Sequence, residues 1–148
     1  MKKETLEIIK NIDFHDLTVS NLNIDLKEKK ISCTFDEYDE LGDDYFPMTL
    51  TFEEVSQFLI DYPQEVSFEL DSVLKAEFKE LANNDMAEFT FSMGFSKPIC
   101  TLTIHFTSLT VKRTLSSTAI DFKKANLESR YEKMEWFEKN NLPVPEWV

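Results

Sequence analysis

The chain has 148 residues, with 16 Lys and Arg against 28 Asp and Glu, so its formal net charge is −12. This length predicts one domain spanning residues 1–148, and a hydrophobic content of 42% with 13 Phe is sufficient for one core. The acidic balance argues against a nucleic-acid-binding protein, which needs clustered Lys and Arg, and only two glycines, Gly42 and Gly94, leave no Gly-rich loop for a nucleotide phosphate.

The N-terminal segment does not have the features of an export signal. Glu4, Glu7 and Lys10 interrupt every apolar run before a secretory core can form. No stretch of the sequence approaches the ~20 apolar residues that are needed to cross a bilayer. Cys33 and Cys100 fall inside predicted strands, as is typical of free thiols in a reducing compartment. We therefore expect a cytoplasmic protein that does not contact a membrane.

Alternating apolar residues between positions 17 and 52 predict three strands. The residues expected on their buried faces are Leu22, Ile24 and Leu26, then Ile31, Cys33 and Phe35, then Phe46, Met48, Leu50 and Phe52. The polar segment 27–30 has hairpin length, so the first two strands should be antiparallel neighbours. Val19 has the opposite parity to Leu22, which predicts a bulge or a strand start near residues 20–21.

The spacing of apolar residues changes from strand to helix after the third strand. A short helix is predicted there, capped by Thr51 and ended by Pro63, with one face formed by Val55, Phe58, Leu59 and Tyr62. Residues 66–82 fit either a strand followed by a helix or one longer element, and we expect the strand followed by the helix.

A second hairpin is predicted further along the chain. The alternation is clearest in Phe89, Phe91, Met93 and Phe95, and it is repeated in Cys100, Leu102, Ile104 and Phe106. Residues 96–98 would link these two strands. Leu109 and Val111 either extend the second of them or begin a further strand.

The C-terminal third predicts one longer helix. Residues 116–118 offer helix caps, and Leu127, Tyr131 and Met134 share one face of a helix that should end near residues 140–141. Trp147 is expected to pack the tail against the body of the protein. The predicted fold class is therefore α+β: a mostly antiparallel sheet of about six strands, a short helix after strand three and a longer C-terminal helix.

All of the excess negative charge lies in the first half of the sequence. Residues 1–74 carry 18 acidic and 6 basic side chains, whereas residues 75–148 carry 10 of each. Residues 31–74 contain 12 acidic side chains and no Lys or Arg. Three interpretations stay open: a solubilising acidic loop, neutralisation by the Lys-rich C-terminal helix, or a surface that attracts a basic protein partner.

Aromatic side chains interleave with the acids in this region, as they do in binding hot spots. Our leading hypothesis is a non-enzymatic protein-binding module in which Tyr38, Tyr45 and Phe46 are anchors. The candidate partner-binding residues are Asp36, Glu37, Tyr38, Asp39, Glu40, Asp43, Asp44, Tyr45, Phe46, Glu53 and Glu54.

The motifs of metal-binding proteins are absent from the sequence. Aligning Gly42 with the sixth position of an EF-hand loop places Leu41 and Met48 where oxygen ligands belong. Adventitious divalent-cation binding stays open for Asp39, Asp43 and Asp44. The residues that transition metals prefer, His15, Cys33, Cys100 and His105, are isolated from one another in sequence. We expect neither a metal site nor a cofactor.

Catalytic motifs are equally scarce. The chain has no G-x-S-x-G elbow to expose a nucleophile. His15 and Asp16 are the only adjacent imidazole and carboxylate, and neighbouring side chains in a strand would point to opposite faces. We therefore predict no catalytic residues and a protein that is not an enzyme.

The first 60 or so residues carry a resemblance to a known group of proteins. Phe14-His15-Asp16 is followed by alternating Leu17, Val19, Leu22, Ile24 and Leu26, a polar hairpin, a second strand, an acidic loop, and Leu50-Thr51-Phe52 leading into Glu54-Val55. This order resembles small acidic bacterial proteins of unassigned function, some of which are similar to immunity proteins of polymorphic toxin systems. The resemblance implies a cytosolic protein that neutralises a toxin by tight binding and has no chemistry of its own.

The electrostatic argument leads to the same class, because a nuclease toxin needs positive charge for its substrate and an anionic inhibitor complements that charge. An alternative from another class is a domain that binds or hydrolyses a small molecule in a cavity lined by Phe89, Phe91, Phe95 and Phe106. Core packing is the favoured interpretation of these four residues. A homodimer through an exposed sheet edge also stays open.

Overall fold

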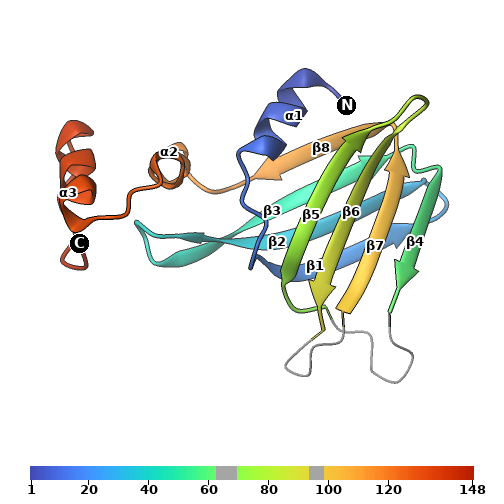
Figure 1. Ribbon diagram of the computed structural model, residues 1–148, viewed down its shortest axis with the longest axis horizontal. Coiled ribbons are helices and arrows are strands. Elements are labelled where there is room, and N and C mark those ends of the chain that lie inside the picture. The colour runs from blue at the N-terminus through green and yellow to red at the C-terminus, as the bar shows by residue number, and fades with distance from the viewer. Residues whose placement is uncertain (63–69, 94–98) are drawn as a thin grey trace.

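Two antiparallel sheets form the body of the protein in the computed structural model, which describes residues 1–62, 70–93 and 99–148 (Figure 1). One sheet has the strand order β1-β2-β3-β8 and the other β4-β7-β6-β5. The strands are β1 (Thr18–Asp25), β2 (Lys30–Asp39), β3 (Asp44–Glu53), β4 (Gln57–Asp61), β5 (Val73–Glu80), β6 (Asp85–Ser92), β7 (Ile99–Phe106) and β8 (Ser108–Arg113). The helices are α1 (Lys3–Lys10), α2 (Ser117–Ala125) and α3 (Arg130–Lys139).

The two sheets are continuous at one corner. β3 leads into β4 and β7 leads into β8, while β3 pairs with β8 and β4 pairs with β7. Glu54, with φ of 52°, makes the first of these bends. At another place an isolated bridge between Thr18 and Ser72 connects the two sheets. Strands that pass from one sheet to the other at a bend are typical of orthogonally packed sheets around one core.

Phe side chains dominate that core. The largest fully buried side chains are Phe35, Phe52, Phe89, Phe91, Phe106, Ile31, Met48, Leu50, Leu102, Ile104, Val73 and Cys33. The ring centroids of Phe52 and Phe106 lie 4.9 Å apart, and those of Phe89 and Phe91 lie 5.7 Å apart. Burying each such ring stabilises the fold by roughly 1.5–3 kcal/mol. Phe89, Phe91 and Phe106 therefore pack within the core; Phe95 lies outside the described residues.

A second, smaller core forms around the C-terminal helices. Phe122 on α2 and Phe137 on α3 are buried together with Val148, and Leu41 from the tip of the β2–β3 hairpin packs against them. In Figure 1 these helices lie beside that tip, away from the two sheets. The ring centroid of Trp147 lies 6.2 Å from those of Phe122 and Phe137, so the tail packs on the C-terminal helices and not, as was predicted for it, on the body of the protein.

Both predicted hairpins are confirmed. β1 pairs with β2 and β6 pairs with β7, each in antiparallel orientation. The predicted irregularity near residues 20–21 is also present, because the register of β1 against β2 shifts between Val19 and Asn21. Leu109 and Val111 begin a further strand, β8, instead of extending β7.

The prediction of a helix after the third strand is wrong. β3 continues to Glu53, and Gln57–Asp61 forms β4, which pairs with β7. Phe58 and Ile60 both pack against the core, so this segment satisfies a period of two as well as the helical spacing. Hydrogen-bonded pairing with β7 makes the segment a strand and not a helix. Thr51 lies within β3 and caps no helix.

The prediction of a helix in the second half of residues 66–82 is also wrong. Val73–Glu80 forms β5, paired with β6, and Ala76 and Phe78 pack against the core from alternate positions. The strand expected before it falls mainly on residues 63–69, outside the described residues. The described part of the chain thus contains eight strands where about six were predicted.

The single C-terminal helix that was predicted is instead two helices. Ser116 caps α2 as expected, accepting a hydrogen bond from the backbone N–H of Ala119 at 3.1 Å. Asn126 then adopts a left-handed conformation with φ of 49°, which ends α2. Ser129 caps α3 by accepting from the N–H of Glu132 at 3.1 Å, and α3 ends before Asn140 as predicted.

Helix α1 was not predicted, although Leu6 and Ile9 have helical spacing and Ile9 is buried. No helix among the described residues is long and apolar enough to span a membrane.

The two cysteines are free and buried. Burial raises the pKa of Cys33 to about 12 and also raises the pKa of Cys100. Since the thiolate is the reactive species, we expect a disulfide-exchange reagent at pH 8 to label neither thiol in the folded protein and both after unfolding in guanidinium. Labelling of Cys33 in the folded protein at a rate close to that of a free thiol would contradict this burial.

Candidate functional site

A groove opens between the β2–β3 hairpin, the segment before β1 and helix α2. Its volume is about 480 Å³. Four carboxylates line it, from Asp13, Asp16, Asp36 and Glu40, together with the rings of Tyr38 and Tyr45. We call these six residues the acidic groove. Phe122 and Lys123 of α2 complete the opposite wall.

Strand geometry places the hairpin residues of the acidic groove on one face. Alternate residues of β2 point to opposite sides, so Asp36 and Tyr38 lie opposite to the buried Phe35. Tyr38 pairs with Tyr45 of β3, and their ring centroids lie 5.2 Å apart. Such cross-strand aromatic pairs contribute roughly 0.2–1 kcal/mol. The two rings therefore form a fixed aromatic platform beside the carboxylates.

The tip of the hairpin is shaped by its own acidic residues. Asp39 accepts a hydrogen bond from the backbone N–H of Leu41 at 2.9 Å. A Cβ atom at Gly42 would lie 2.9 Å from Oδ2 of Asp39, so only glycine fits this turn without displacing that carboxylate. Asp43 has φ of 51°, a left-handed conformation that Asp and Asn tolerate better than most residues. Asp39 and Asp43 thus build the turn.

Tyr38 donates a hydrogen bond to the carboxylate of Asp43, and this bond raises the pKa of Tyr38 to about 12. The folded protein therefore holds the phenol proton more tightly than the unfolded chain, whose Tyr pKa is about 10. The resulting stabilisation is fully present below pH 10 and is lost as the pH rises from about 10 through about 12. We expect the Tyr38 Cζ resonance in an NMR titration to report a pKa near 12.

The Asp43→Asn variant is the matched comparison for this titration, because Asn keeps the left-handed turn while removing the charge. Its Tyr38 pKa should move toward 10. An unchanged Tyr38 titration in Asp43→Asn would contradict the assigned cause.

Glu37 does not belong to the exposed surface that the sequence predicts. It lies on the core side of β2 and is only 2% exposed. Arg113 of β8 donates from Nε and Nη2 to its two carboxylate oxygens, each at 2.8 Å. Lys123 of α2 has its Nζ 4.0 Å from Oε2 of Glu37. This buried cluster therefore links the sheet to α2.

The remaining candidate residues divide between the two ends of the hairpin. Asp43 lies with Tyr38, Glu40 and Trp147 in a neighbouring pocket of about 370 Å³. Asp44 is exposed near the tip, and Phe46 is half-buried opposite Glu37. Glu53 and Glu54 lie at the far end of β3, roughly 30 Å away at ~3.3 Å per residue. The structure therefore separates these two residues from the acidic groove.

The groove also contains residues that the sequence analysis did not select. His15 and Asp16 occur in a turn before β1, where Asp16 has φ of 68°, so their side chains meet at 2.9 Å and do not point apart as they would in a strand. Asp13 comes from the same segment. Only the adjacency of His15 and Asp16 was visible in the sequence; their position beside the hairpin depends on the tertiary fold.

Little of the negative charge in the groove is neutralised. Among the described residues, Asp36 and Glu40 take part in no ion pair, nor do Asp43 and Asp44 at the hairpin tip. The neutralisation by the C-terminal helix that stayed open in the sequence analysis is realised at Glu37 and not at these four residues. The groove is therefore a concave surface with a net negative charge and exposed aromatic rings.

Within residues 1–62, 70–93 and 99–148, no group of three or more His, Cys, Asp or Glu side chains is arranged to hold a metal ion.

No protein-family model matches the chain, and no curated protein sequence matches it.

Proposed function

We propose that the protein is a non-enzymatic binding module that captures a basic protein in the acidic groove, and that it is an immunity protein that neutralises a basic toxin. The observation that carries this proposal is the uncompensated charge of Asp36 and Glu40 beside the exposed Tyr38–Tyr45 platform. A partner loop rich in Lys or Arg fits both features, because its charges meet carboxylates and its aliphatic stems or guanidinium planes stack on the rings.

Each part of the groove has a different role in this capture. The exposed carboxylates attract a cationic partner over a distance of about one Debye length and raise the association rate. The two tyrosines supply rigid contact area and slow dissociation, since aromatic anchors commonly carry most of the energy of an interface. Tyr45 is 63% exposed and Tyr38 is 37% exposed, so a partner would remove both rings from water.

The alternative function, a small-molecule site lined by phenylalanines, has less support. Phe89, Phe91 and Phe106 are fully buried and pack against other rings of the core. Side chains in this arrangement fill the interior and leave their surfaces unavailable to a ligand.

The proposal is tested with the protein encoded by the open reading frame next to this one. We expect that product to be basic, to arrest bacterial growth when expressed alone, and to be neutralised when the present chain is co-expressed. In a purified system, Tyr45→Ala should weaken binding at least about tenfold, as expected for an aromatic anchor.

Tyr131→Ala is the matched control, because Tyr131 is 76% exposed on α3 and does not line the acidic groove. It should leave binding unchanged. The proposal is overturned if the neighbouring product does not bind, or if both tyrosine variants weaken binding equally.

A further inference from the structure

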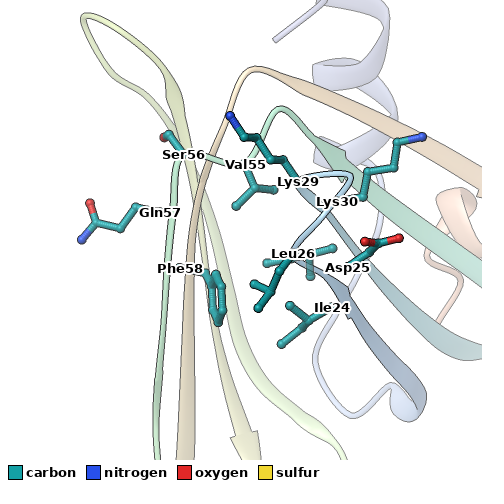
Figure 2. Close-up of a pocket in the computed structure, with 10 residues that line it drawn as sticks. Ile24, Asp25, Leu26, Lys29, Lys30, Val55, Ser56, Gln57 and Phe58 are labelled. Atoms are coloured by element: carbon teal, nitrogen blue, oxygen red, sulfur yellow. The ribbon is translucent and has the colours of Figure 1, made fainter.

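A separate cavity of about 300 Å³ lies where the turn between β1 and β2 meets the segment that joins β3 to β4 (Figure 2). Its apolar wall consists of Ile24, Leu26, Ile31, Val55 and Phe58. This volume is at the lower end of the ~300–1,000 Å³ that is usual for small-molecule sites. The cavity contains none of the residues of the acidic groove.

The apolar side chains converge on one space. Figure 2 shows Ile24, Leu26 and Phe58 pointing toward one another below Val55. Ile31 is only 1% exposed and belongs to the core, whereas Leu26 is 73% exposed. A large aliphatic side chain is thus left in water at the edge of an apolar hollow, and an aliphatic ligand would cover it.

Backbone contacts hold the two sides of this cavity together. The N–H of Val55 donates to the carbonyl oxygen of Lys29 at 3.0 Å. Lys29 and Glu54, one on each side, have φ of 54° and 52°, a conformation that costs non-glycine residues energy. The surrounding structure keeps both residues in this conformation, so the cavity is formed before any ligand arrives.

Charged side chains of both signs line the cavity. Two are basic, Lys29 and Lys30, and one is acidic, Asp25. Nζ of Lys30 lies 3.8 Å from Oε1 of Glu53, and Oδ1 of Asp25 accepts a hydrogen bond from the backbone N–H of Glu28 at 3.1 Å. Lys29 takes part in no ion pair with the rest of the described chain. Its ammonium group is therefore available to an anion.

We propose that this cavity binds a small aliphatic carboxylate. The hydrocarbon chain packs against Ile24, Leu26 and Phe58, and the carboxylate pairs with the ammonium group of Lys29. The combination of an apolar wall with one available cation selects against aliphatic ammonium compounds, which would meet Lys29 as a like charge. The site is independent of the proposed capture of a basic protein, since it uses other residues and the opposite charge.

The test is an NMR titration of the full-length, ¹⁵N-labelled protein with sodium octanoate, in parallel with octylammonium chloride. We expect octanoate to shift saturably the backbone resonances of residues 24–31 and 55–58, and octylammonium to leave them unchanged. The inference is overturned if octanoate causes no saturable shift in these residues, or if octylammonium binds equally well.

Two variants sharpen this test. Lys29→Gln should weaken octanoate binding about fivefold to tenfold, because a charge-assisted contact is lost. Leu26→Asp should abolish the saturable shifts, since it puts a like charge at the mouth at a position exposed enough to leave the fold intact. Ile99→Asp is the control, because Ile99 is also an exposed apolar residue, at 53%, and does not line the cavity. This variant should bind octanoate as the wild type does. Equal binding by Leu26→Asp and Ile99→Asp would place the ligand elsewhere.

Discussion

Replacing Arg113 by Met is expected to lower the free energy of unfolding by about 3–5 kcal/mol at pH 7. Arg113 makes two hydrogen bonds of 2.8 Å to Glu37, a carboxylate that is only 2% exposed. The variant leaves that carboxylate buried with only Lys123 nearby, at 4.0 Å, so most of the desolvation penalty is uncompensated. Urea denaturation followed by circular dichroism measures the change.

The double variant Glu37→Met with Arg113→Met separates a lost ion pair from a lost packing contact. Removing both charges should restore most of the stability that Arg113→Met loses, since no unpaired carboxylate remains in the core. Lys112→Met, at the exposed residue next to Arg113, is the matched control and should change stability by less than about 0.5 kcal/mol. If Arg113→Met were as stable as Lys112→Met, the buried ion pair between Arg113 and Glu37 would not stabilise the fold.

Reversing three charges at the hairpin is expected to slow capture of the basic partner by about 10-fold to 100-fold at low salt. The chosen residues are Asp36, Glu40 and Asp44, each changed to Lys. Glu40 and Asp44 are exposed and Asp36 is half-buried, whereas Asp39 and Asp43 build the turn and their replacement would disturb its shape. The effect should fall on the association rate more than on dissociation, because long-range attraction acts before contact.

A second triple variant with the same net charge separates the effect of where the charges are reversed from the effect of the total charge. Glu28, Asp61 and Glu80 are exposed residues that do not line the acidic groove, and changing these three to Lys alters the net charge equally. This control should retain an association rate within about threefold of the wild type. Equal slowing by both triple variants would show that overall charge, and not the position of these carboxylates on the hairpin, drives the encounter.

The hairpins were the part of the fold that the sequence predicted best. Local alternation specifies a strand well when the turn is short, as in β1–β2, because pairing and sidedness are then decided by neighbouring residues. β4 could not be predicted in this way. Phe58 is compatible with both helical and strand spacing, and only pairing with the distant β7 makes this segment a strand.

The candidate site was predicted in part for a similar reason. Asp36, Tyr38 and Tyr45 share a face that strand parity defines, and they do line the groove. The same parity places Glu37 beside Phe35 on the buried side, a signal that was present in the sequence but outweighed by its acidic neighbours. Asp13 and His15 reach the groove through the tertiary fold alone, so no local pattern could have selected them.

The central claim is that an uncompensated acidic groove captures a basic partner. Its most direct test is the association rate constant of the wild-type chain with the neighbouring gene's product. We would measure this rate by stopped flow with Trp fluorescence, at chosen NaCl concentrations between 20 and 500 mM. We predict a rate that falls steeply with salt in the wild type and shallowly in the Asp36, Glu40 and Asp44 triple variant. Salt dependences that are equally shallow in both proteins would contradict the account.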